Sequence, residues 1–265
     1  MTITFLGTGT SQGVPVIACE CEVCTSTDTR DKHLRSSVLV EAEGKVIVID
    51  SGPDFRYQML RAGVKHLDAV VFTHEHKDHT AGLDDIRAFN FVQQEPMDVY
   101  ATERVQQSLK QEFAYIFAAF KYPGIPQLNL HTINNNEPFN VGALQFTPIE
   151  VMHYRLPVLG FRIGDFTYIT DAKTIAPEEV EKIKGTKILV INALQKQPHI
   201  SHFTFDEAIA FAQQIGAEKT YFTHISHRLG KYEDVSKELP EGIELAYDGL
   251  KIEVAPPQPS PGERV

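Results

Sequence analysis

The sequence lacks tryptophan, contains only three cysteines and has no long apolar run. No apolar stretch approaches the about 18 residues that a membrane-spanning helix needs. The start, Met1–Leu6, has neither the basic flank nor the long apolar segment of a signal peptide. All three cysteines fall between positions 19 and 24, too few and too close for the disulfide framework of a small secreted domain. We therefore expect a cytoplasmic protein that does not contact a membrane.

Positive charge is also scarce. The chain has 25 lysines and arginines against 35 aspartates and glutamates, a formal charge of −10, which disfavours extended binding to nucleic acid. A local cationic pocket is compatible with this balance. With 265 residues and 42% apolar content, the chain can build a sizeable core. We expect one domain over residues 1–254 and a C-terminal tail over 255–265, whose four prolines argue against packed secondary structure.

Short β-rich runs alternate with helical patterns along most of the chain. This alternation predicts a layered α/β or α+β domain. The pattern predicts a hairpin formed by Ser37–Glu41 and Lys45–Asp50, and helices at Phe55–Ala62, Pro177–Ile183 and Thr204–Ile215. It also predicts a helix that begins near His79 and turns Leu83, Ile86 and Phe89 inward, and one longer helix over Glu103–Phe120.

Histidines are abundant, eleven in all, and the densest group directly follows the predicted strand Ala69–Thr73. The group reads His74-Glu75-His76-Lys77-Asp78-His79. Two histidines two residues apart beyond a strand can point their rings to one side, and the Asp-His pair that follows can serve a second metal ion. Imidazole nitrogen and carboxylate oxygen suit zinc, manganese or iron. The histidines are not one helical turn apart, so the zinc-protease pattern does not apply.

This His-x-His-x-Asp-His loop resembles that of the metallo-β-lactamase fold hydrolases. The resemblance extends to His153, Asp171 and His224, each of which follows an apolar strand at a matching place in the order of the chain. It implies an α+β fold: a four-layered αββα sandwich of two mixed sheets with helices outside. We expect the ligand loops to converge in a cleft at the edges of the sheets.

The resemblance also implies two catalytic divalent metal ions, zinc or manganese, about 3.5 to 4 Å apart with a bridging hydroxide as nucleophile. Asp50, at the end of a strand, looks like the family's carboxylate that orients the loop from behind the ligands. Asp78 would count among the catalytic residues as well as the ligands. The implied ligands are His74, His76 and His153 for the first ion, Asp78, His79 and His224 for the second, and Asp171 between them.

The three cysteines suggest a separate metal site. Cys19, Cys21 and Cys24 place three thiols in six residues, and structural zinc requires four tetrahedral ligands. We predict His227 as the fourth. The competing interpretations are a redox pair of Cys21 and Cys24, or thiols without a common role, but the thioredoxin-like unit that usually carries such a pair is absent.

A glycine-rich opening narrows the resemblance. Phe5–Pro15, the Cys-x-Cys-x-x-Cys segment and Thr223–His227 together resemble the PhnP branch, the phosphoribosyl cyclic phosphate phosphodiesterases of phosphonate breakdown. The branch implies a structural zinc on the three cysteines and His227. It also implies a histidine acting as general acid before a late helix, for which His202 is the nearest match and His199 a rival. Alternatively, His202 only sits beside a helix cap at Thr204.

We interpret the sequence as that of a metal-dependent phosphodiesterase acting on a small cyclic phosphate or nucleotide-like diester, with a homodimer as a possible assembly. Three alternatives stay open. One is a protein of the pyrroloquinoline quinone biosynthesis type, and another is a tRNA-processing endonuclease, although a basic arm for gripping tRNA is missing and the charge of −10 opposes a large polyanion. The third is a metal-stabilised binding module without catalysis.

Overall fold

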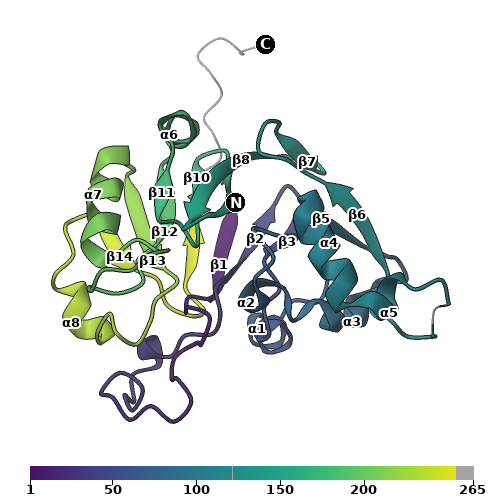
Figure 1. Cartoon of the computed structure of the whole chain (residues 1–265), viewed down its shortest axis with the longest axis horizontal. Helices are drawn as coiled ribbons and strands as arrows, with labels where there is room; N and C mark the ends of the chain where they lie inside the picture. Colours follow the sequence, from purple (N-terminus) through teal and green to yellow (C-terminus); the bar gives the residue numbers. More distant parts are fainter. Residues whose placement is uncertain (121, 255–265) are drawn as a thin grey trace.

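The computed structural model describes residues 1–120 and 122–254, so the tail expected over 255–265 lies outside the described residues. Two sheets face each other and helices cover both outer surfaces (Figure 1). This is the four-layered αββα sandwich that the sequence predicted. Among the described residues, no helix combines the length and the apolar character needed to cross a membrane.

The first sheet begins with antiparallel strands and ends with parallel ones. Pairing is antiparallel from β15 to β3 and parallel from β3 to β6. Its seven strands, in spatial order, are β15 (Lys251–Glu253), β1 (Thr2–Gly7), β2 (Ser37–Ala42), β3 (Lys45–Ile49), β4 (Ala69–Val71), β5 (Met97–Ala101) and β6 (Leu128–Thr132).

The second sheet repeats this plan. Strands β11 to β10 pair antiparallel, and β10 to β14 pair parallel. In spatial order the strands are β11 (Thr174–Ile175), β8 (Leu144–His153), β9 (Leu156–Ile163), β10 (Phe166–Tyr168), β12 (Ile188–Asn192), β13 (Lys219–Thr223) and β14 (Ile243–Leu245), while β7 (Phe139–Val141) pairs with the start of β8.

Alternation along the strands builds the layers. In β3, Ile47 and Ile49 point into the core between the sheets, where they join Phe161 and Tyr168 of the second sheet. Val48 points the other way, into the cluster under the helices. Because successive side chains of a strand face opposite sides, the one apolar run Val46–Ile49 supplies both cores.

Helices shield the outer face of each sheet. On the first sheet lie α1 (Phe55–Ala62), α2 (Lys77–Thr80), η2 (Leu83–Ile86), α3 (Arg87–Gln93), α4 (Glu103–Glu112) and α5 (Ala114–Phe117). On the second sheet lie α6 (Pro177–Ile183), α7 (Phe205–Ile215) and α8 (Tyr232–Ser236). Thr204 caps α7 in a capping box with Glu207, which stabilises that helix start.

The prediction of one continuous helix beginning near His79 is wrong. The segment is divided into α2, η2 and α3, although Leu83, Ile86 and Phe89 are buried as expected. The division falls at Gly82, where a Cβ would lie 2.1 Å from the Gly52 carbonyl oxygen. This backbone contact between segments distant in sequence overrides the local helical pattern.

The helix predicted over Glu103–Phe120 is likewise too long. It is divided at Phe113, whose backbone leaves the helical region at φ −109° and ψ 43°, and α5 ends at Phe117. Four short elements were not predicted: β7, β11, α8 and a 3-10 turn, η1 (Thr29–Asp31). These elements have two to five residues and lack the compact apolar run that identifies other short strands, such as β4.

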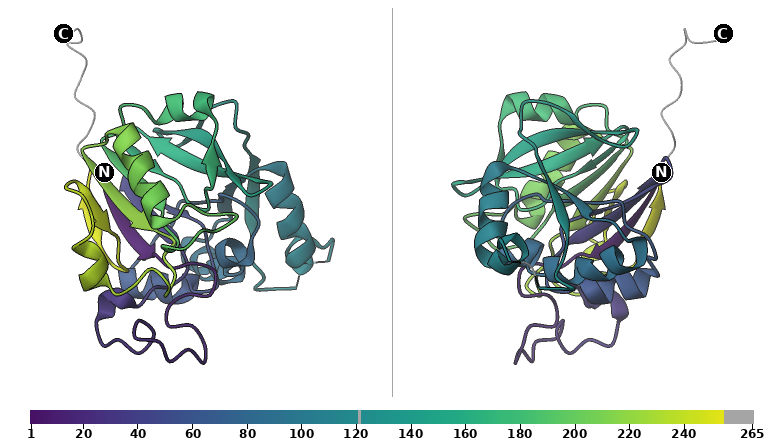
Figure 2. Two further views of the ribbon diagram at one scale, coloured as in Figure 1. Left: turned by 60° about the vertical axis from the view of Figure 1, so that its left-hand side comes forward. Right: turned by 90° about the vertical axis from the view of Figure 1, so that its right-hand side faces the viewer.

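The long loop that connects β1 to β2 projects from the sandwich (Figure 2). It is anchored at its root, where Gly9 pairs with both Arg35 and Ile225 in isolated bridges. The Ile225 amide donates to the Thr8 carbonyl oxygen at 2.8 Å. The loop is therefore attached directly to the segment that follows β13.

We predict that Gly52→Ala destabilises the protein through one contact. A Cβ at Gly52 would lie 2.0 Å from the Asp78 carbonyl oxygen, so the backbone must shift, with an expected loss of about 1 to 3 kcal/mol in the free energy of unfolding. Gly164→Ala is the matched control. Its Cβ would meet open space at φ +58°, so only backbone strain of about 1 kcal/mol applies. Urea denaturation measures both, and equal losses would contradict the prediction.

Candidate metal centre

The predicted ligands come from five separate segments that meet at one edge of the sandwich. His74 lies just beyond β4, and His79 is in α2. His153 is the last residue of β8, whereas Asp171 and His224 follow β10 and β13. Strand ends bring these side chains together, as expected for ligands that each follow an apolar strand.

Two carboxylates and two imidazoles form the innermost group. Asp78, His79, Asp171 and His224 offer ligand atoms that all lie within 4.8 Å of one another. His79 Nε2 lies 3.2 Å from an oxygen of Asp78 and 3.2 Å from an oxygen of Asp171. His224 Nδ1 lies 3.3 Å from Asp171 Oδ2. The set assigned to the second ion, together with the bridging aspartate, is thus assembled in one place.

Asp50 lies behind this group and holds His79 in place. Its Oδ2 is 2.7 Å from His79 Nδ1, and it accepts hydrogen bonds from the amide and the hydroxyl of Thr73. The Thr73 hydroxyl also lies 2.9 Å from His74 Nδ1. Both rings are therefore oriented with Nε2 toward the centre, which is the arrangement that carboxylates and hydroxyls behind metal ligands produce.

The histidines assigned to the first ion also converge. The ring centres of His74 and His76 are 4.6 Å apart, those of His76 and His153 are 5.2 Å apart, and those of His74 and His153 are 6.1 Å apart. His153 Nδ1 lies 2.9 Å from the Ser201 carbonyl oxygen, which leaves Nε2 available. The three rings face one another at the mouth of the inner group.

The donor atoms fit divalent metal ions. His74 Nε2 is buried and has no hydrogen-bond partner among residues 1–120 and 122–254. His79 Nε2 is buried as well, and the oxygens of Asp78 and Asp171 at 3.2 Å do not meet hydrogen-bond geometry. An unpaired buried nitrogen is costly unless another group binds it. Imidazoles and carboxylates together form a donor set suited to zinc or manganese.

Buried charges shift the pKa values of this group in opposite directions. Burial alone would raise the pKa of Asp171, but His224 and His79 hold it well below its usual range. Burial opposes the protonated ring of His79, yet Asp78, Asp171 and Asp50 raise its pKa well above the usual value. Asp171 therefore stays ionised at neutral pH, which favours a cation at the centre.

His202 lies among the candidate metal ligands and not at the edge of the group. It is buried, and its ring centre is 4.4 Å from that of His153 and 4.8 Å from that of His224. With His153 and Asp171 it forms a further group able to hold a metal. His199 is 5.2 Å away, ring centre to ring centre, and half-buried. Burial lowers the pKa of His202 to about 2, despite the nearby Asp171.

Two residues at the opening were missed by sequence reasoning. Tyr154 and Arg155 form the turn between β8 and β9 and line a cavity of about 450 Å³ together with His76, His153 and Ile200. The predicted strands stopped at Val151 and resumed at Gly160, so the turn was not recognised. The apolar run Leu156–Leu159, which continues β9 up to the turn, was the signal available.

Backbone strain gathers around the same centre. Seven non-glycine residues among those described have positive φ, and four of them are Asp50, Tyr154, Asp171 and His224. Such conformations cost free energy and persist only where the surroundings fix them. The strand ends are therefore held in unusual geometry that aims the side chains inward.

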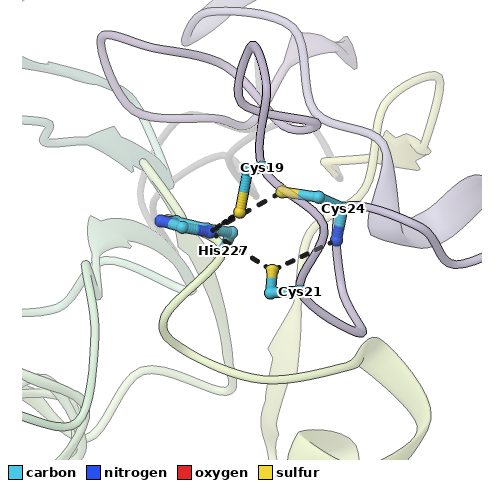
Figure 3. Close-up of side chains that lie close together, drawn as sticks. All are labelled: Cys19, Cys21, Cys24 and His227. Atoms are coloured by element: carbon cyan, nitrogen blue, oxygen red, sulfur yellow. Dashed lines mark hydrogen bonds between the residues drawn. The ribbon is translucent and has the colours of Figure 1, made fainter.

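The cysteine cluster is assembled at a second place, with His227 among the thiols (Figure 3). The three sulfurs lie 3.3, 3.3 and 3.6 Å from His227 Nδ1, for Cys19, Cys21 and Cys24 in that order. Figure 3 shows the cysteines on the N-terminal loop and the histidine on the loop after β13. The arrangement fits a closed, four-ligand zinc site.

Amide groups favour the thiolate form in this cluster. The Cys24 amide donates to Cys21 Sγ at 3.5 Å, and this bond, with the His227 ring, lowers the pKa of Cys21 to about 6. Burial raises the pKa of Cys24 to about 11. Zinc binding would displace the proton of the Cys24 thiol, because the thiolate is the form that binds the metal.

Similarity to known proteins agrees with this geometry. The sequence matches the family described as "Beta-lactamase superfamily domain" over residues 45–225, and the chain therefore belongs to that superfamily. A solved structure of a new diphosphatase from the PhnP family superposes with a TM-score of 0.89 and 41% sequence identity, covering 96% of this chain and 98% of that one. This similarity narrows the chain's place in the superfamily to the PhnP family.

Two further relatives share the fold or most of the sequence. The structure of Zn(2+)-bound PqqB from Methylobacterium extorquens has a TM-score of 0.77 at 21% identity, covering 96% of this chain and all of that one, and shows a shared fold. A curated protein of Porphyromonas gingivalis named octanoyltransferase is 42% identical over 253 residues, 95% of this chain. The chain spans about half of that relative, 51% of its length.

We predict different consequences for the two histidines of the loop after β13. His227→Ala should release one tightly held zinc ion per chain and lower the melting temperature, because the thiol cluster loses its fourth ligand. His224→Ala should keep that zinc and lose activity. Metal analysis of dialysed protein and thermal unfolding measure both, and Cys21→Ser should behave as His227→Ala does. If His227→Ala retained the zinc and the wild-type melting temperature, the fourth ligand would have to be sought elsewhere.

Proposed function

We propose that this protein is a metal-dependent phosphodiesterase acting on a small cyclic phosphate or nucleotide-like diester. The observation that carries the proposal is the buried group of Asp78, His79, Asp171 and His224 beside an open cavity, next to the unpaired His74 Nε2. A cavity of about 450 Å³ suits a small ligand. Membership of the superfamily and the likeness to a PhnP-family diphosphatase support hydrolysis at phosphorus.

Each predicted residue has a defined task in this proposal. His74, His76 and His153 would hold one divalent ion, Asp78, His79 and His224 a second, and Asp171 would lie between them. Bound divalent ions would lower the pKa of a water molecule toward neutrality and neutralise charge that develops on the phosphate. Asp50 and Thr73 keep the rings of His79 and His74 turned toward that charge.

His202 would donate a proton to the leaving oxygen after attack at phosphorus. Burial keeps its ring neutral in the free protein, since its pKa is lowered to about 2. A phosphate bound beside the ring would raise this pKa, because an adjacent negative charge stabilises the imidazolium form. His202 would then be protonated in a larger fraction of the substrate-bound protein than of the free protein. His199, more exposed, is the second residue to test.

A diphosphate is the second candidate substrate, because the PhnP-family relative at 41% identity is described as a diphosphatase. Hydrolysis of a diphosphate is also attack at phosphorus, but the leaving group is a phosphate, which needs less help from an acid than an alkoxide does. Dependence on His202 therefore separates the two substrate classes.

Other functions have weaker support. The net charge of −10 opposes a tRNA substrate, and the structure of PqqB shares only the fold at 21% identity. The chain spans 51% of the Porphyromonas gingivalis relative named octanoyltransferase, so that name is not transferred to this chain.

We predict that Asp78→Ala and His76→Ala each abolish turnover of bis(p-nitrophenyl) phosphate and lower bound metal. Each variant removes a ligand from one of the two positions. His131→Ala is the matched control, since His131 lies on β6 and contacts Asp98 rather than the centre. It should keep both the rate and the metal content. Wild-type rates in either ligand variant would overturn the two-metal proposal.

We predict that His202→Ala lowers kcat by about 10²- to 10⁴-fold on diesters with poor leaving groups, as expected for loss of a general acid. The loss should be smaller on p-nitrophenyl esters, whose leaving group needs no proton. Metal content should be retained. A uniform loss of rate would move the acid role to His199, and a loss of metal would make His202 a ligand alongside His153 and Asp171.

A further inference from the structure

The turn beside the centre carries an aromatic residue where glycine would be the least strained choice. Tyr154 has φ +58° and stands in the two-residue connection between His153, the last residue of β8, and Leu156, the first of β9. Two-residue hairpins that need positive φ at their first position usually place glycine there. Such strain points to a role for the side chain.

Packing does not explain the tyrosine. Its side chain is 51% exposed, and no hydrogen bond to its hydroxyl is found among the described residues. Its contact with a neighbour is the Arg155 guanidinium, 5.1 Å from the ring centre. Arg155 itself forms no ion pair with any carboxylate among residues 1–120 and 122–254. The fold thus exposes an aromatic ring and, over it, a guanidinium group that is not neutralised by a carboxylate.

Both side chains line the cavity that opens onto the candidate metal centre. Its other walls include His76 and His153, and the apolar side chains of Leu156 and Ile200, of which Ile200 is 66% exposed. A ring face and apolar walls suit a planar group, and the guanidinium suits a phosphate. The one cavity therefore offers a stacking surface and a cation within reach of the reacting centre.

We infer that Tyr154 is a specificity residue that stacks on the planar base of a nucleotide-like substrate, with Arg155 contacting its phosphate. This inference rests on the proposed function and names the substrate class within it. The base would lie on the β8–β9 turn while the ester to be cleaved reaches the rings of His76 and His153. A phosphate ester without a planar group would lose the contact with Tyr154 and keep the contact with Arg155.

Equilibrium binding tests the inference without requiring catalysis. Isothermal titration of the metal-containing protein with adenosine 5′-monophosphate and with ribose 5-phosphate compares ligands that differ by the base. We expect wild type to prefer the nucleotide by about tenfold, the size of one stacked base. Tyr154→Phe should keep this ratio, Tyr154→Ala should bring it to about one, and Arg155→Ala should weaken both ligands alike.

Two controls separate recognition from structure. Tyr57→Ala removes a similarly exposed tyrosine on α1, which also lies near an arginine, Arg61 at 5.9 Å. This variant should leave the ratio unchanged. Tyr154→Gly should lose the ratio while its melting temperature stays at or above the wild-type value, because glycine adopts positive φ without strain. A ratio of one in wild type, a ratio kept in Tyr154→Ala, or a marked fall in the melting temperature of Tyr154→Gly would overturn the inference. Failure of the proposed phosphodiesterase activity would instead appear as absent turnover with base-dependent binding intact.

Discussion

The burial of two carboxylates against one imidazole is the constraint on which the rest of this structure depends. Asp50 and Asp171 are almost wholly removed from water, and each lies within 3.2 Å of a nitrogen of His79. A buried charge without partners costs several kcal/mol, so the partners must be held accurately. The positive φ of Asp50, Asp171 and His224 shows that the strand ends accept strain to achieve this.

Much of the architecture could be predicted because its signals are local. Short apolar runs identify most of the strands. The metallo-β-lactamase resemblance, carried by His74, His153, Asp171 and His224 in that order, implied that the ligands share one edge. The αββα layering is confirmed, as is the cap of α7 at Thr204. The geometry also brings Cys19, Cys21 and Cys24 to His227, across more than two hundred residues.

What the sequence did not predict depends on contacts distant along the chain. The break at Gly82 follows from the carbonyl of Gly52, some thirty positions earlier, which no periodicity near residue 82 records. The turn at Tyr154 and Arg155 was hidden because a strained tyrosine has no turn signature in sequence. His202 was placed by resemblance alone, and how deeply it is buried depends on the loop before α7, whose path a single sequence does not specify.

The pairing of the first and last strands of the chain, β1 and β15, has a consequence for how this domain can be combined with others. Met1 and Val254 exchange backbone hydrogen bonds of 3.1 and 2.8 Å, so β1 starts where β15 finishes. From there β1 runs about 20 Å before it reaches the glycine-rich loop, given six residues of extended chain. A second domain joined at either position would be attached at one shared point, a strand's length from the histidines. Covalent fusion of another domain at this point would therefore leave the approach to the histidines open.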